Sequence, residues 1–217
     1  MPRDIVYLDL ETQRTANDAG GWTRKCDMRM SVGVTFSIAT GRYEVFGEAQ
    51  VNRLIERLRR ADLIIGFNVL NFDYHVLMGY TILDLIAELQ TADLMVEMEK
   101  RLGHRLGLDA IAQATLGIQK TAAGLDAIRW WREGRVLEIA EYCCFDVKVL
   151  RLVHEHGCRH KELFFQDRFA QRQRIEVDWT HLDRESDGLI PGSKEMPAPA
   201  VAGAQQSLAL PVRCEES

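Results

Sequence analysis

The chain has 217 residues, of which 47% are hydrophobic and 27% are charged. These values are typical of one soluble globular domain with a sizeable core, and they exclude a chain that is disordered throughout. The formal net charge of −5 argues against a non-specific nucleic-acid binder, because such proteins are usually basic. A nucleic-acid function would therefore need local basic patches and bound cations.

The sequence also predicts where the protein resides. Its apolar runs are only a few residues long, far short of the about 20 that span a bilayer, so we expect no membrane segment. The first residues, MPRDIVYLDL, lack the basic region and apolar stretch of a secretory signal. The five cysteines form no C-x-x-C pair and are interpreted as reduced thiols. We therefore expect a cytoplasmic protein.

The first third of the chain predicts strands, followed by an alternation of strands and helices. Residues 4–10 are apolar apart from the acids, which is typical of a strand in the middle of a sheet. The segment at 51–58 has apolar residues at the spacing of an amphipathic helix. The other expected elements are a hairpin over 30–39 and 43–46, a buried strand over 62–66, and a helix that begins within 71–80.

From about residue 83 to 157 the pattern is almost wholly helical, and its last part is a long helix over about 136–156. A closing hairpin is expected over 163–166 and 174–179. The remainder lacks periodicity and is rich in Gly, Pro, Ala and Ser, so we expect a flexible tail over 181–217. The pattern predicts an α/β domain over 1–180, with a central mixed sheet of three antiparallel N-terminal strands plus parallel strands, flanked by helices.

Carboxylates stand on faces of these elements that are otherwise apolar. Asp9 and Glu11 project from one face of the first strand, because side chains alternate along a strand. Asp73 and Asp146 each interrupt an apolar helical stripe, and no Lys or Arg shares these faces. Burying several carboxylates together is prohibitive unless each is protonated, paired with a base or bound to a cation. Two divalent ions would cancel four charges, and all-oxygen ligands suit Mg²⁺ or Mn²⁺.

The same residues form three motifs in a fixed order. They are Asp9-Leu10-Glu11, then Asn68 through Phe72-Asp73, then Tyr142 through Asp146. This order resembles the DEDDy 3′-to-5′ exonucleases of the ribonuclease H-like (DnaQ-like) superfamily, over about residues 5–156. A related subclass has a histidine five residues before the last acid. That position here is Glu141, which favours the tyrosine subclass.

The resemblance implies a ribonuclease H-like fold and the hydrolysis of terminal phosphodiester bonds of single-stranded DNA or RNA ends, releasing nucleoside monophosphates by a two-metal-ion mechanism. By resemblance, Asp9 would bridge both metals, and Glu11 and Asp146 would complete the site that activates the attacking water. Asp73 would support the second metal, and the Tyr142 hydroxyl would hold the water. Residues four apart on a helix share a face, so Tyr142 and Asp146 are expected to point into one site.

Three further residues are candidates for substrate binding. Asn68 is interpreted either as a residue that orients Asp73 or a phosphate, or as a polar turn residue. Trp22 stands in a loop with several basic residues, which is either a flap whose Trp stacks a base or an ordinary solvated loop. Thr12, directly after Glu11, is the third candidate. Cys143 and Cys144, which lie between Tyr142 and Asp146, are interpreted as small apolar packing residues.

Two alternatives to the exonuclease remain open. The same fold can carry a structure-specific endonuclease. The second alternative is a non-catalytic docking module for a helicase or polymerase, tethered by residues 181–217. Such a module should have lost at least one of the four carboxylates. The histidines of HEHGCRH, residues 154–160, are interpreted as a helix C-terminus rather than a zinc site.

Overall fold

The computed structural model describes residues 3–119, 124–179 and 182. The chain divides into two units, Met1–Asp187 and Gly188–Ser217, and the described residues all belong to the first. Apart from Leu182, the predicted tail over 181–217 lies outside the described residues. In the described part of the chain, none of the helices combines the length and the apolar character needed to cross a membrane.

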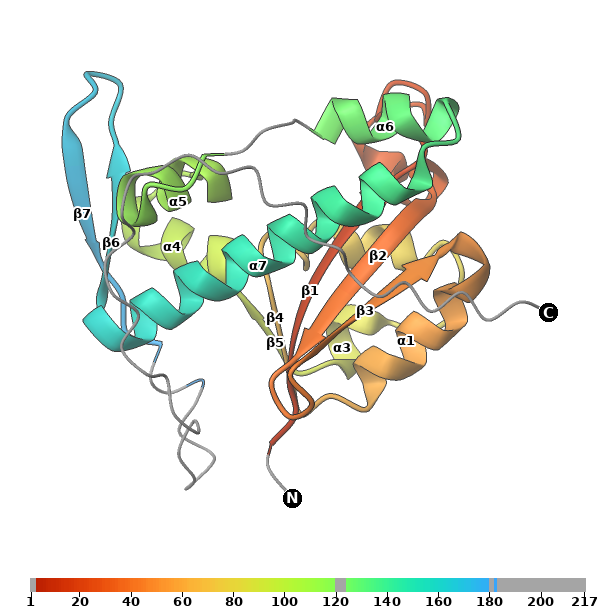
Figure 1. Ribbon diagram of the computed structural model, residues 1–217, viewed down its shortest axis with the longest axis horizontal. Coiled ribbons are helices and arrows are strands. Elements are labelled where there is room, and N and C mark those ends of the chain that lie inside the picture. Colours follow the sequence, from red (N-terminus) through yellow and green to blue (C-terminus); the bar gives the residue numbers. More distant parts are fainter. Residues whose placement is uncertain (1–2, 120–123, 180–181, 183–217) are drawn as a thin grey trace. The chain divides into compact units, whose positions relative to one another are not determined.

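A five-stranded mixed sheet forms the centre of the unit, with the strand order β3-β2-β1-β4-β5 (Figure 1). The central strand β1 (Ile5–Thr12) pairs antiparallel with β2 (Met30–Ser37), which pairs antiparallel with β3 (Arg42–Gly47). On its other side β1 pairs parallel with β4 (Leu63–Gly66), and β4 with β5 (Thr91–Asp93). This confirms the predicted mixed sheet with three antiparallel N-terminal strands.

The strand β5 contradicts the expectation that residues 83–157 are almost wholly helical. It has three residues, Thr91, Ala92 and Asp93, and pairs with Ile64, Ile65 and Gly66 of β4. A segment this short shows neither helical nor strand periodicity, so pairing with β4 decides its conformation. The Asp93 carboxylate also accepts hydrogen bonds from the backbone N–H groups of Met95 and Val96, and so begins the next helix.

Side chains of β1 alternate between two hydrophobic cores, one on each face of the sheet. Ile5 and Tyr7 pack in the core on the side of α7 (Val136–His160), while Val6, Leu8 and Leu10 pack with α1 (Val51–Arg59). Figure 1 shows the long helix α7 running across the sheet. The remaining helices are η1 (Trp22–Met28), η2 (Glu48–Gln50), α2 (Asp73–Leu77), α3 (Leu85–Glu88), α4 (Leu94–Leu102), α5 (Leu108–Leu116) and α6 (Gly124–Arg132).

The predicted closing hairpin is present as a separate two-stranded sheet of β6 (Glu162–Gln166) and β7 (Arg172–Glu176). The second strand was expected over 174–179, whereas it begins two residues earlier and ends three residues earlier. The Val177 N–H still donates to the carbonyl of Lys161, the residue opposite it in this register. Lys161 ends α7 with a positive φ of 57°, so β6 begins only at Glu162 and its partner strand ends at Glu176.

Candidate active site

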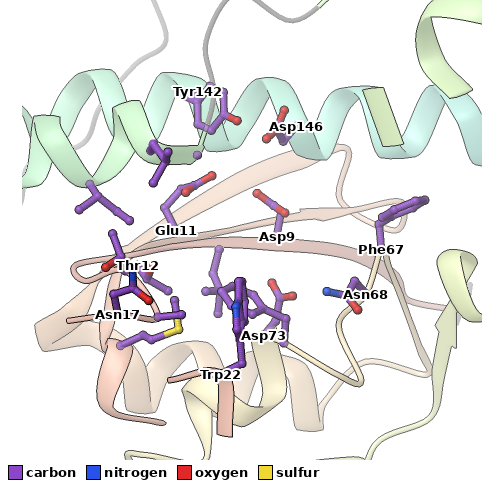
Figure 2. A pocket seen from close by; sticks show the side chains of 18 residues that line it. Asp9, Glu11, Thr12, Asn17, Trp22, Phe67, Asn68, Asp73, Tyr142 and Asp146 are labelled. Carbon is purple, nitrogen blue, oxygen red and sulfur yellow. The ribbon is translucent and has the colours of Figure 1, made fainter. Parts of the chain in front are cut away.

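Three carboxylates meet between the central strand and the long helix. Asp9 and Glu11 lie on the face of β1 that is turned toward α7, and Asp146 lies on α7 itself (Figure 2). One ligand oxygen from each lies within 4.8 Å of the others. Within the described residues, this is the one group of His, Cys, Asp or Glu side chains that is compact enough to hold a metal ion.

The fourth acid, Asp73, is placed differently from the sequence-based expectation. It was expected to interrupt an apolar stripe inside a helix, but it is the first residue of the short helix α2. It stands outside the three-residue group, yet it lines the same pocket as Asp9, as Figure 2 shows. Its side chain is 3% exposed, and its Oδ1 atom is buried without a hydrogen-bond partner.

A turn before Asp73 explains this position. Asn68 has a positive φ of 68°, so the backbone turns sharply where β4 ends. The Asp93 carboxylate, at the end of β5, holds the turn, because it accepts hydrogen bonds from Asn68 N–H at 2.8 Å and Leu70 N–H at 3.1 Å. Asn68 lines the pocket, and its Oδ1 is also buried without a hydrogen-bond partner. The sequence gives no signal for this role of Asp93.

The electrostatics of the cluster favour protonation or cation binding. Burial raises the pKa of Asp9 well above its ordinary value, and the charges of Asp146, Asp73 and Glu11 raise it further. Burial also raises the pKa of Asp73 to about 7, with a further contribution from the charge of Asp93. The metal-free cluster therefore resists full ionisation, which bound cations would permit.

The carboxylates line a pocket of about 680 Å³, a size typical of ligand sites. Among the described residues that line it there are four acids and no Lys or Arg. An acidic cluster with the orphaned Oδ1 atom of Asp73, in a pocket whose described lining residues include no Lys or Arg, fits divalent cations with oxygen ligands. Asp9, Glu11, Asp146 and Asp73 are the residues that would hold them.

Tyr142 and Asp146 share a face of α7, as their spacing predicts, and both line the pocket. The Tyr142 side chain is 8% exposed, and its ring meets Trp130 of α6 edge-on at 6.1 Å between centroids. Figure 2 places Tyr142 beside Asp146, on the α7 side of Asp9 and Glu11. Packing against Trp130 fixes the ring where its hydroxyl can act in the pocket.

The loop after β1 forms another wall of the pocket. The pairing of β1 with β2 shifts register between Glu11 and Thr12, where the chain leaves the sheet. Trp22 lines the pocket with 66% of its surface exposed, and its ring centroid lies 6.4 Å from that of Phe72. Thr12 also lines the pocket, but its hydroxyl donates to the carbonyl of Arg14 at 3.0 Å, so its proton is used within the loop.

The loop is tied to α6 across the fold. Arg132 of α6 forms a salt bridge with Asp18 at 2.8 Å. Residues on both sides of this bridge line the pocket, Asn17 from the loop and Ile128 from α6. The salt bridge thus joins two walls of the pocket.

Cys143 was expected to serve only as packing, and this interpretation is incomplete. Its side chain is fully buried, as expected, but its Sγ atom lies 3.3 Å from Oδ2 of Asp9 and 3.3 Å from the Asp9 carbonyl oxygen. Cys144 is buried in the core on the α7 side of the sheet. Only the packing of α7 on β1 reveals that one of the two adjacent thiols touches the acidic cluster.

The other polar motifs of the sequence lie elsewhere. Arg53, Arg57 and Arg60 line a separate pocket together with Glu44 and Glu56. The HEHGCRH segment forms the last turns of α7, as expected. There His154 is buried, and its Nδ1 lies 2.9 Å from the Tyr7 hydroxyl.

Comparisons with known proteins agree with this architecture. A structure of the family B DNA polymerase from the hyperthermophilic archaeon Pyrobaculum calidifontis is similar to the chain with a TM-score of 0.56 and 14% sequence identity. The match covers 72% of this chain and 25% of the polymerase, so the chain spans about a quarter of that protein's length, and the likeness concerns the fold alone. No curated protein sequence matches the chain. The RNase_H_2 model of the RNase H superfamily matches residues 6–156, which is more than half of the chain, and the chain therefore belongs to the RNase H superfamily.

Proposed function

We propose that the protein is a metal-dependent 3′-to-5′ exonuclease that hydrolyses terminal phosphodiester bonds of single-stranded DNA or RNA and releases nucleoside monophosphates. Membership of the RNase H superfamily supports a nuclease, and hence a hydrolase. The observation that carries the proposal is the compact group of Asp9, Glu11 and Asp146, with the orphaned oxygen of Asp73 in the same pocket. The direction of hydrolysis rests on the resemblance of the three motifs to the DEDDy exonucleases.

The residues that line the pocket have separate roles in the proposed reaction. Asp9, Glu11, Asp73 and Asp146 would hold two Mg²⁺ or Mn²⁺ ions, and the bound ions would supply Lewis acidity at the scissile phosphate. The Tyr142 hydroxyl orients the attacking water by a hydrogen bond, because it lies one helical turn from Asp146 in the same pocket. Trp22 and Phe72 offer aromatic surfaces to the terminal base, and Asn68 offers an amide to the backbone of the strand.

The resemblance of the three motifs to the DEDDy exonucleases supports action at chain ends, so we place the endonuclease second. The docking module is third, since all four carboxylates are present.

The decisive experiment measures product release from a single-stranded oligonucleotide labelled at its 5′ end, with Mg²⁺ or Mn²⁺ and with EDTA. We expect stepwise shortening and monophosphate release that stop in EDTA and in Asp9→Asn and Asp146→Asn. Glu141→Gln is the matched control, because Glu141 is an exposed acid on the same helix. Activity that persists in both aspartate variants would refute the proposal.

A second substrate separates the alternatives. Cutting of a circular single strand would identify an endonuclease. Binding of the oligonucleotide without metal-dependent hydrolysis would identify a docking module.

A further inference from the structure

Cys143 makes a contact that the proposed chemistry does not use. The residue lies 134 positions from Asp9 in the chain, and α7 brings its thiol to 3.3 Å from the Oδ2 atom and 3.3 Å from the carbonyl oxygen of Asp9. The side chain is fully buried.

The thiol acts here as a donor and not as a ligand. A thiol has one S–H to donate, and a backbone carbonyl oxygen can only accept. Two oxygens of Asp9, one from its carbonyl and one from its carboxyl group, lie 3.3 Å from the one sulfur, so the sulfur is the donor in this contact.

The orientation of the Asp9 carboxylate matters for the cluster. Asp9 belongs to the compact group with Glu11 and Asp146, and it lines the same pocket as Asp73. A donor fixed on α7 restricts rotation of the Asp9 carboxylate and partly offsets the repulsion from its neighbours. Groups that hold metal ligands in place in this way typically change metal affinity 10- to 100-fold when they are removed.

We propose that Cys143 is a positioning residue, whose S–H group holds the Asp9 carboxylate in the orientation in which the cluster binds divalent cations. This rests on the proposed metal-dependent function. It assigns to one of the two adjacent cysteines a role that the other cannot fulfil, since Cys144 does not touch Asp9. Cys144 is therefore the matched control, with the same chemistry at the next position of the same helix.

The first test measures Mn²⁺ binding to the full chain by titration calorimetry. We expect Cys143→Ala to bind Mn²⁺ about 10-fold more weakly than the wild type, with Cys144→Ala within about twofold of it. Cys143→Ser keeps a donor and should bind more tightly than Cys143→Ala. Equal dissociation constants in Cys143→Ala and Cys144→Ala would overturn the proposal, and would do so even if the nuclease activity is confirmed.

The second test examines the metal-free protein by infrared spectroscopy, where thiol S–H stretching bands are free of other protein absorption. The Cys143 band is assigned by its loss in Cys143→Ser, and the Cys144 band by its loss in Cys144→Ala. We expect the Cys143 band at lower frequency, and expect Asp9→Ala to move it. A Cys143 band that Asp9→Ala leaves in place would refute the contact.

The two tests also separate the failure of this inference from that of the proposed function. If Cys143→Ala fails to fold, Cys143→Ser and the wild-type infrared spectrum decide the outcome. A wild-type protein that binds no Mn²⁺ overturns both the metal site and the role of Cys143. A wild-type protein that binds Mn²⁺ but hydrolyses no nucleic acid overturns the nuclease alone.

Discussion

Replacing Asp73 with asparagine is expected to stabilise the metal-free protein while abolishing its activity. The Asp73 carboxyl is 3% exposed, and burial raises its pKa from 3.8 to about 7. Between these two pH values the folded protein retains a proton that the unfolded chain has lost. The free energy of unfolding therefore falls as the pH rises from about 4 to about 7, and the penalty is complete above the folded-state pKa.

The size of the effect follows from the two pKa values. The difference between 3.8 and about 7 corresponds to about 4 kcal/mol of lost stability above pH 7. Of this, about 3 kcal/mol falls between pH 5 and pH 8. Asparagine cannot ionise, so the Asp73→Asn variant does not lose this part of the free energy of unfolding as the pH rises. The charge of Asp73 also raises the pKa of Asp9, so its removal reduces the penalty at Asp9 in the same direction.

The assay is urea unfolding in EDTA at pH 5 and pH 8. We expect the wild type to lose about 3 kcal/mol more between these pH values than Asp73→Asn does. Asp109→Asn is the control, because it removes the same charge from an exposed position on α5. If the wild type and Asp73→Asn lose the same free energy between pH 5 and pH 8, the argument for a buried carboxyl at Asp73 is wrong.

Three further outcomes are expected. Tyr142→Phe keeps the ring that packs on Trp130, so it should fold normally yet slow single-turnover hydrolysis about 100-fold; an unchanged rate would exclude the hydroxyl. Trp22→Ala removes a side chain that is 66% exposed, so thermal stability should persist while KM for single strands rises about 10-fold; an unaltered KM would rule out stacking. Asn68→Ala should destabilise the protein by about 1–2 kcal/mol, because alanine is strained at the positive φ of this position. Asn68→Gly should not be destabilised, and both variants should hydrolyse the substrate more slowly. Equal melting temperatures for the two variants would contradict the expected backbone strain.

Local periodicity allowed much of the fold and the site to be predicted from the sequence. The alternation along residues 5–11 placed Asp9 and Glu11 on one face of a central strand, and β1 confirms this. The spacing of Tyr142 and Asp146 placed both on one face of a helix, and both line the pocket. The amphipathic pattern predicted α1 with its buried stripe. These features depend on the periods of strands and helices, which a single segment displays by itself.

Only the tertiary structure decided the features that join distant segments. The three-residue strand β5 exists because it pairs with β4, and Asp93 at its end holds the turn that places Asp73. The packing of α7 on β1 brings the Cys143 thiol to Asp9, 134 positions away. The sequence by itself determined which residues carry the charge and which faces they occupy, because these properties are local. How close the carboxylates lie, and what touches them, depends on how α7 and the ends of β4 and β5 pack around β1, which no local pattern encodes.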